Sequence, residues 1–454
     1  MKDRMLLSPF SMPIIFFGAV IIIGTLLLHH SFSLNAPSIS WIDALLTSTS
    51  ATCVTGLVVV DTGSFFNRFG QTVIMGLMQI GGLGIMTFTS LIFYLWRRRV
   101  SLTDRISVGQ SLLHDPSFHL GRFLVQIVVI TLVIEMTGAS LLFLMAPSEF
   151  TPYFALFHSV SAFCNAGFSL FSDNLVRWQG HSGVNMVFIG LIVLGSIGFS
   201  VLMELLLRGA HKIKRRGNAG SGKPLTWYTR VVLQTSVFLI LGGWAALYLS
   251  EFVGFHRDMV THDAILSSLF QSVTCRTAGF NTFDISQMTN VSLLIMTGLM
   301  FIGGASGSCA GGIKVSTFRI LTAFAAAQLR GRKQAVAGKF AVDEETLNKA
   351  MVLLVFSVSI IAVASLLLNI TEGGDIPHAE ARGRSLEILF ETVSAFGTVG
   401  LSTGLTPRLT DPGKLVIVAL MFMGRLGPIL FIAAIQNLQK RTFFQWPEES
   451  MLVG

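Results

Sequence analysis

The chain has 454 residues, of which 52% are apolar and only 12% are charged, and its mean hydropathy is +0.69. Soluble domains carry about twice that share of charged residues, so the composition excludes a soluble globular protein and predicts a polytopic membrane protein. The formal net charge of +8 could indicate a nucleic-acid partner, but its placement between apolar stretches indicates membrane orientation instead.

Long apolar stretches of the kind that cross a membrane recur along the chain. They comprise residues 14–28, 123–145, 184–207, 231–249, 351–368 and 415–435. The first follows Lys2 and Arg4, as a signal peptide would, but no small-residue cleavage site comes after it. We therefore favour a retained helix.

Four shorter apolar stretches lie between the long ones, at residues 39–51, 153–163, 262–274 and 385–396. With about a dozen residues each, they are too short to cross a hydrocarbon core of ~30 Å. Each opens with residues typical of a helix start: Ser40 before Asp43, Thr151 before Pro152, Thr261 before Asp263, and Ser385 before Glu387. A peripheral helix or an external plug would explain one copy, whereas four copies predict re-entrant pore helices.

A glycine segment follows each short stretch. Gly56, Gly167, Gly279 and Gly400 recur at intervals of roughly 110 to 120 residues. Glycine permits positive φ and close backbone approach, and the residues before it are small or suit extended backbone. We predict that main-chain oxygens here form a filter that binds K⁺, at Val54, Thr55, Gly56, Asn165, Ala166, Gly167, Thr277, Ala278, Gly279, Thr398, Val399 and Gly400.

These patterns predict an all-α membrane protein with four helix–pore helix–helix repeats in pseudo-fourfold arrangement around one central pore. The repeats comprise residues 1–98, 99–211, 212–330 and 331–441, followed by a C-terminal tail at 442–454. No ring of Asp or Glu lies in the filter, which favours a monovalent cation and, with glycine in all four segments, potassium.

The second helix of the third repeat must be broken, because one helix over residues 290–328 would reach nearly 60 Å. The predicted break is a gate loop made of Gly303, Gly304, Ala305, Ser306, Gly307, Ser308, Cys309, Ala310, Gly311 and Gly312. Close helix packing through small residues is the alternative. Lys314, just after the run, is either a positive barrier or an anchor.

Ionisable residues inside apolar stretches are costly and therefore informative. Arg425 either faces the permeation pathway as part of the gate or is neutralised by an acidic neighbour. We expect Glu135 and Glu204 to be paired or interfacial, and Arg276 to brace the filter through carbonyls or a carboxylate. The cysteines are expected to be small packing residues rather than disulfides or metal ligands; they are Cys53, Cys164, Cys275 and Cys309.

Basic residues gather at residues 97–122, 208–230 and 330–349 and at Lys440 and Arg441. This asymmetry predicts that these segments and both termini are cytoplasmic. The basic face could contact anionic lipid or a cytosolic partner.

The glycine segments resemble the filters of the Trk/Ktr/HKT superfamily of potassium transporters, and the whole chain resembles its Ktr-type membrane subunits. The resemblance includes the stretch from Thr274 to Thr282 and the run Trp446-Pro447-Glu448-Glu449. It implies sodium-dependent potassium uptake or symport across a bacterial inner membrane, with Na⁺ as an activating or coupled ion and no covalent cofactor. It also implies a homodimer with a pore in each protomer and a cytosolic nucleotide-binding regulatory ring on the basic face. Some relatives selective for sodium have serine at the first filter glycine, so Gly56 implies potassium.

Two other classes are considered. A secondary transporter for another cation or small solute could be built from parallel repeats, but it would not need the same glycine four times. An enzyme is disfavoured, because no metal cluster, catalytic triad or nucleotide-binding glycine motif is found in the sequence.

Overall fold

The computed structural model describes residues 11–84, 120–214, 224–255, 259–374, 377, 380–381 and 383–427. These residues are almost entirely helical, and the strands among them, β1 (Val336–Ala337) and β2 (Phe340–Ala341), form one small hairpin. The all-α prediction is confirmed. The repeat boundaries at 98/99 and 441/442, most of the first basic segment and the tail at 442–454 lie outside the described residues.

Four units of the same plan follow one another along the chain. Each begins with a long helix: α1 (Ser11–His29), α7 (Leu120–Met145), α11 (Trp227–Leu247), continued by the π-helix η3 (Tyr248–Val253), and α15 (Glu344–Gly373). A short helix comes next: α2 (Trp41–Thr52), α8 (Pro152–Phe163), α12 (Thr261–Thr274) and α16 (Arg384–Gly397). The last helices are α4 (Arg68–Gly82), α9 (Ser182–Ser196) with α10 (Phe199–Lys214), α13 (Asn290–Phe301) with α14 (Val315–Leu329), and α17 (Asp411–Leu426).

Small elements complete the connections between these helices. They are α3 (Thr62–Phe65) and the 3₁₀ turns η1 (Ser31–Ser33), η2 (Val176–Trp178), η4 (Ile285–Gln287) and η5 (Thr406–Arg408). The predicted boundary at 330/331 falls directly after α14, whereas the boundary at 211/212 lies within α10.

Several described helices are long and apolar enough to cross a membrane. Unbroken candidate spans are Leu124–Met145, Trp227–Val253 and Glu344–Gly373, and α9 with α10 forms a bent pair that fits either a broken span or a re-entrant loop. The first helices expose apolar side chains, such as Val133 at 59%, Phe238 at 70% and Val355 at 63%. Such exposure is unfavourable in water and suits contact with lipid, so the chain is a multi-pass membrane protein.

The apolar stretch at residues 184–207, predicted to be of the kind that crosses a membrane, is not one continuous helix. The stretch breaks between α9 and α10, which are bent by 110°. Gly198 stands at the break with φ +88°, and a Cβ there would lie 2.9 Å from the carbonyl oxygen of Ser306. Glycine therefore allows both the turn and the close approach of another segment.

The predicted helix starts are partly confirmed. Ser40 accepts a hydrogen bond from the Asp43 amide at 3.0 Å, and Thr151 caps the helix that has Pro152 in its first turn. Helix α12 has no side-chain cap, and α16 begins at Arg384 rather than Ser385. Its N-cap is Gly383 in a left-handed conformation, whose carbonyl accepts from the Glu387 amide.

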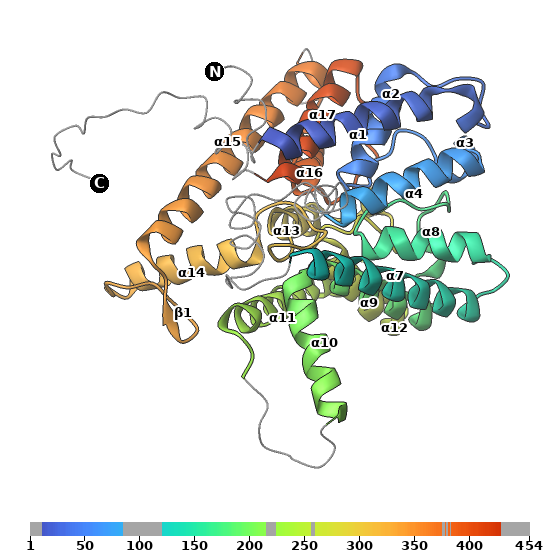
Figure 1. The fold of residues 1–454 in the computed structure, drawn as a ribbon. Helices are drawn as coiled ribbons and strands as arrows, with labels where there is room; N and C mark the ends of the chain where they lie inside the picture. The colour runs from blue at the N-terminus through green and yellow to red at the C-terminus, as the bar shows by residue number, and fades with distance from the viewer. Residues whose placement is uncertain are drawn as a thin grey trace, which may run out of the picture.

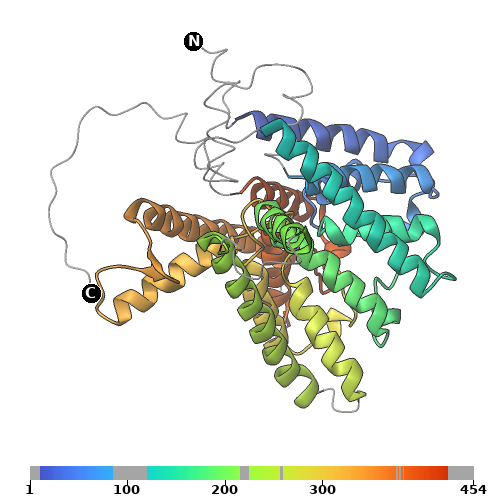
Figure 2. The same cartoon turned by 60° about the horizontal axis from the view of Figure 1, so that its bottom comes forward.

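The units close into a ring. The second helix of each unit packs on the short helix of the next: α4 on α8, α9 on α12, α13 on α16, and α17 on α2. In Figure 1 the colours accordingly run around the molecule, and the red α17 lies beside the blue α1 and α2. Figure 2 shows the same four groups from below, with α14 and the β hairpin extending to one side. Pseudo-fourfold repeats are thus confirmed.

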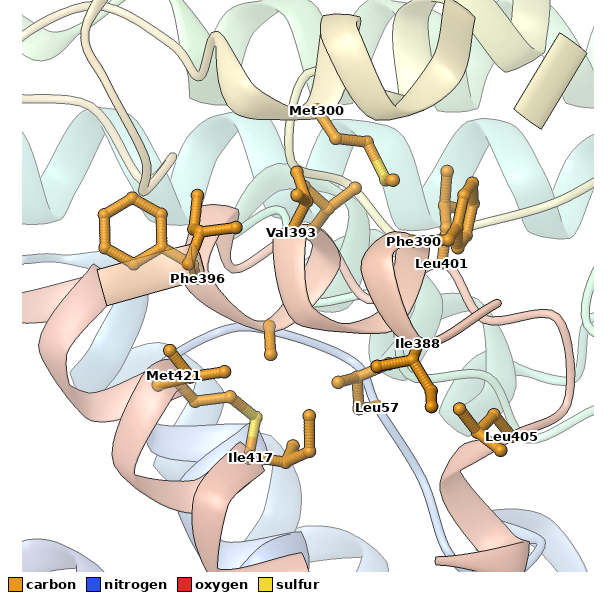
Figure 3. Close-up of a cluster of buried hydrophobic side chains, with 14 of the residues drawn as sticks. Leu57, Met300, Ile388, Phe390, Val393, Phe396, Leu401, Leu405, Ile417 and Met421 are labelled. Atoms are coloured by element: carbon orange, nitrogen blue, oxygen red, sulfur yellow. The ribbon is translucent and has the colours of Figure 1, made fainter. Parts of the chain in front are cut away.

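The C-terminal halves of the short helices, which lead into the glycine segments, are buried, as re-entrant helices require. Figure 3 shows α16 between Met300 of α13 and the α17 side chains Ile417 and Met421, with Leu57 from the first unit beside it. All four of these side chains are buried in one apolar cluster. Truncating one such side chain to alanine would cost about 2–5 kcal/mol.

Candidate functional site

The four segment glycines meet at the centre of the ring. A Cβ on Gly56 would lie 2.9 Å from the Cα of Gly167, and one on Gly167 would lie 2.9 Å from the Cα of Gly279. A Cβ on Gly279 would lie 2.7 Å from the Val399 carbonyl oxygen, and one on Gly400 would lie 3.0 Å from the Cα of Gly56. Each unit therefore touches the next through bare backbone, and no side chain fits between them. We call these four residues the glycine ring.

A second position in each segment is also left-handed. The residue two before the glycine has positive φ in every case: Val54 at 57°, Asn165 at 59°, Thr277 at 69° and Thr398 at 50°. The glycines have φ of 97°, 70°, 76° and 89°. Left-handed backbone costs a non-glycine residue about 1–3 kcal/mol and persists only where the surroundings impose it. Of these four residues, only Asn165 has a side chain type that tolerates the left-handed conformation, so only there could the conformation have been predicted.

A hydroxyl of each short helix fixes the segment that follows it. In the first and fourth units the hydroxyl accepts: the Gly56 amide donates to Ser50 Oγ at 3.0 Å and the Gly400 amide donates to Ser394 Oγ at 3.1 Å. In the second and third units the hydroxyl donates: Ser161 Oγ to the Phe168 carbonyl at 2.7 Å and Thr274 Oγ1 to the Phe280 carbonyl at 2.6 Å. Thr274 therefore corresponds to Ser50, Ser161 and Ser394. Between this hydroxyl-bearing residue and its glycine, the third segment is one residue shorter than the others.

The surroundings of the glycine ring suit a cation. The four short helices end at the segments, and a helix C-terminus carries partial negative charge. The Oγ1 atoms of Thr55, Thr277 and Thr398 are buried and have no hydrogen-bond partner within the described residues. Carbonyl and hydroxyl oxygens are the hard ligands that alkali and alkaline-earth cations prefer.

A loop at residues 302–314 lies against the ring. It joins α13 to α14, which confirms the predicted break in this helix. A Cβ on Gly303 would lie 3.5 Å from Thr277 Cγ2, and one on Gly311 would meet Thr398 Oγ1. The two ends of the loop are joined by the bond from the Gly303 amide to the Ile313 carbonyl at 2.8 Å. The 302–314 loop therefore contacts the left-handed residues of two segments.

The same loop reaches the other two units. Cys309 Sγ lies 2.9 Å from the Gly82 carbonyl at the end of α4. The Ala305 amide donates to the Ser196 carbonyl at 2.9 Å, and the Phe199 amide donates to the Gly307 carbonyl at 3.0 Å, both at the break between α9 and α10. The 302–314 loop thus crosses the middle of the molecule and contacts all four units.

Three cationic side chains bind carbonyls of this loop. Arg425 donates to the carbonyls of Cys309 and Gly81, Lys314 Nζ donates to Ala310 at 2.6 Å, and Arg276 Nη2 donates to Gly303 at 3.0 Å. Within the described part of the chain no carboxylate lies within ion-pair distance of these three side chains. The acidic neighbour considered for Arg425 is therefore not found there, and backbone carbonyls take its place.

The remaining ionisable residues are hydrogen-bonded. Glu204 accepts from Thr226 and Thr229 and lies 3.9 Å from Arg208, as expected of a paired residue. Glu135 accepts from Gln79 Nε2 at 3.2 Å instead of from a cation. The four cysteines are buried and carry free thiols.

Two polar residues of the short helices were missed by the sequence analysis. His158 Nε2 lies 3.0 Å from Ser169 Oγ, and Glu391 accepts from Thr406 Oγ1. Both are buried and hold the chain that leaves the glycine ring. His158 and Glu391 stand the same number of residues before their segment glycines, and this repeated position was the signal in the sequence that could have found them.

Comparisons with known proteins agree with this geometry. The chain matches the TrkH family, described as cation transport protein, over residues 5–443. It is 38% identical over 445 residues to Ktr system potassium uptake protein B of Bacillus subtilis (strain 168), covering 96% of this chain and 95% of the relative. It is 35% identical to potassium/sodium uptake protein NtpJ of Enterococcus hirae, covering 97% of this chain and 95% of the relative.

A solved structure shares the fold. The crystal structure of the potassium transporter TrkH from Vibrio parahaemolyticus superimposes with a TM-score of 0.73 at 21% identity, covering 97% of this chain and 86% of that one. Four helical units closed around a glycine ring, a family match over nearly the full length, and full-length relatives lead to one assignment. The chain belongs to the TrkH family of cation transport proteins.

Proposed function

We propose that this protein takes up potassium across the bacterial cytoplasmic membrane, through a pathway lined by the four glycine segments. The observation that carries this proposal is the closure of the glycine ring, in which each segment touches the next through backbone alone. The relatives described above are named as potassium or potassium/sodium uptake proteins.

The proposed ligands are the main-chain oxygens of the twelve segment residues predicted from the sequence. Rings of carbonyl oxygens can replace the hydration shell of a potassium ion. No Asp or Glu stands among those twelve residues, which argues against a calcium site built from carboxylates. The partial negative charges of four helix ends favour a cation at the centre.

The 302–314 loop is the proposed gate. Its direct contacts with two segments and its hydrogen bonds to the other two units support a gate that lies across the proposed pathway. Arg425 and Lys314 add positive charge at this loop and disfavour cations there. Opening then requires the loop to leave these carbonyl contacts.

Sodium and protein partners complete the proposal. One relative is named for both potassium and sodium, which supports Na⁺ as the activating or coupled ion. We place the basic segments and both termini in the cytoplasm, where they would bind anionic lipid and a nucleotide-binding regulatory ring. Arg330, Arg332 and Lys333 are described residues of this face, and they are exposed. A homodimer with one pathway in each protomer is part of the same proposal.

The test is rescue of a bacterium that lacks its potassium uptake systems, at limiting potassium, with and without sodium. The expected result is growth that depends on this protein and improves with sodium. Growth only at high potassium, with the protein present in the membrane, would contradict the proposal. Uptake of a different labelled cation or solute in the same cells would favour a parallel-repeat secondary transporter.

A further inference from the structure

The third unit departs from the other three at one place, where the short helix meets the second helix. In the other units a glycine of the second helix packs on the carbonyl that ends the short helix: Gly81 on Thr52, Gly195 on Phe163, and Gly424 on Phe396. The third unit has no such contact, because α13 ends at Phe301. An arginine side chain stands there instead.

Arg276 precedes the left-handed residue of the third segment. The residues at this position in the other units are small: Cys53, Cys164 and Gly397. The guanidinium of Arg276 donates from Nη2 to the Gly303 carbonyl at 3.0 Å, while Nη1 is buried without a partner within the described residues. The side chain is only 3% exposed.

The position of Gly303 explains how a buried cation is accommodated. Gly303 follows the C-terminal end of α13, where partial negative charge favours a guanidinium. A hydrogen bond to a charged group is also stronger than a neutral one. No carboxylate of the described chain competes for Arg276 within ion-pair distance.

Gly303 also lies where the two ends of the 302–314 loop are hydrogen-bonded to each other. Its amide donates to the Ile313 carbonyl, and Ile302 and Ile313 form a parallel bridge. The Gly303 backbone lies so close to Gly311 that a Cβ would overlap the Gly311 carbonyl. Arg276 therefore holds the base of the loop, whereas Arg425 holds its middle at Cys309.

We propose that Arg276 is a positioning residue that couples the third glycine segment to the 302–314 loop, by holding Gly303 where the loop closes the pathway. Thr277, the next residue, is left-handed and faces Gly303, so the arginine and the segment backbone move together. This inference rests on the proposed function, because it names what holds the proposed gate closed.

The test uses full-length protein in liposomes and the variant Arg276→Gln, in the intact chain and in a chain that lacks residues 306–311. In the intact chain we expect basal rubidium flux to rise about tenfold, since a hydrogen bond to a charged group is lost. In the shortened chain the same substitution should have little effect. An equal rise in both backgrounds would show that Arg276 acts on the segment alone, and no rise in the intact chain would also overturn the proposal.

A second measurement does not depend on ion flux. Cys309 is only 1% exposed, so a water-soluble thiol reagent should modify it slowly in the native protein. We expect Arg276→Gln to increase modification of Cys309 about tenfold, measured by mass spectrometry, and Arg276→Lys to increase it less. The matched control is Arg408→Gln, at an exposed arginine in η5. Unchanged modification would overturn the coupling, whereas absence of potassium flux in the native protein would count only against the proposed function.

Discussion

The glycine ring and the 302–314 loop are both non-helical backbone at the centre of a membrane protein, yet they are held in different ways. Each glycine segment is fixed by hydroxyls and carbonyls of its own short helix, a few residues away, as Ser50 and Ser394 show. The loop is fixed by residues distant in sequence, such as Gly82 and Arg425.

This difference indicates which region can move. Local bonds survive as long as the short helix does, and α16 is enclosed by apolar side chains from three units (Figure 3). The loop contacts are separate hydrogen bonds to different units, so they can be exchanged without unfolding a helix. A rigid ring beside a releasable loop is the arrangement that the proposed filter and gate require.

The largest effect is expected from a side chain in the ring. A Cβ at Gly56 would lie 2.6 Å from the Ala166 carbonyl, and φ is +97°, so Gly56→Ser must move the segment. We expect the preference for potassium over sodium to fall about a hundredfold, a change of about 2.7 kcal/mol. Competition between labelled rubidium and sodium measures it. The matched control is Gly76→Ala in α4, where a Cβ meets nothing within 4 Å. An equal preference for potassium over sodium in the native protein and in both variants would contradict the filter assignment.

Removal of the loop should have the next largest effect. Deleting residues 306–311 removes the contacts to Gly195, Gly82 and Arg425 together. Basal rubidium flux in liposomes should rise about thirtyfold, since about 2 kcal/mol of closing interactions is lost. The preference for potassium should persist. A folded deletion variant with native flux would rule out the loop as a gate.

A single loop contact is expected to contribute less. Arg425→Ala removes the donors to Cys309 and Gly81 without shortening the loop. We expect flux to rise about fivefold to tenfold, and Arg425→Lys, which keeps the charge, to lie closer to the native protein. Lower expression with native flux per molecule would instead assign Arg425 a structural role only.

The smallest effect is expected outside the membrane, at the ion pair of Asp173 with Arg177, 2.8 Å apart. Partial burial raises the pKa of Asp173, but hydrogen bonds from Arg177 lower it by more than burial raises it, so the net pKa lies below its usual value. The pair therefore stabilises the fold above the ordinary carboxyl pKa, and this contribution is lost as pH falls through the lowered pKa. Both side chains are more than one-third exposed, so Asp173→Asn should reduce the free energy of unfolding at neutral pH by less than about 1 kcal/mol. Thermal denaturation measures this change, and rubidium flux should be unaffected.

Much of the fold was predictable because the signals recur. Four short apolar stretches, each followed by a glycine, could only be explained by four units. The glycine-rich segment at residues 303–312 could not remain helical at low cost. The ring and the break in the third unit therefore followed from composition and spacing.

Other features depend on tertiary contacts that leave little trace in a sequence. The bend at Gly198 arises because Ser306 approaches it, and Gly198 alone does not predict that neighbour. The left-handed residues Val54 and Thr277 have side chains that ordinarily disfavour the conformation. Arg276 binds a backbone carbonyl, one of the two kinds of partner expected from the sequence, but no side-chain pattern reveals that this carbonyl belongs to Gly303, 27 residues away.

The closure of the ring also has a consequence for how the protein is made. The last contact joins Gly400 to Gly56, and Lys414 forms an ion pair with Asp43 at 2.7 Å between the same two units. At about 5–20 residues per second, a ribosome needs on the order of tens of seconds to travel between these two glycines. During that time the newly inserted first quarter has polar backbone without its final neighbour. Membrane insertion must therefore protect this polar backbone of the first unit until the fourth unit has been made.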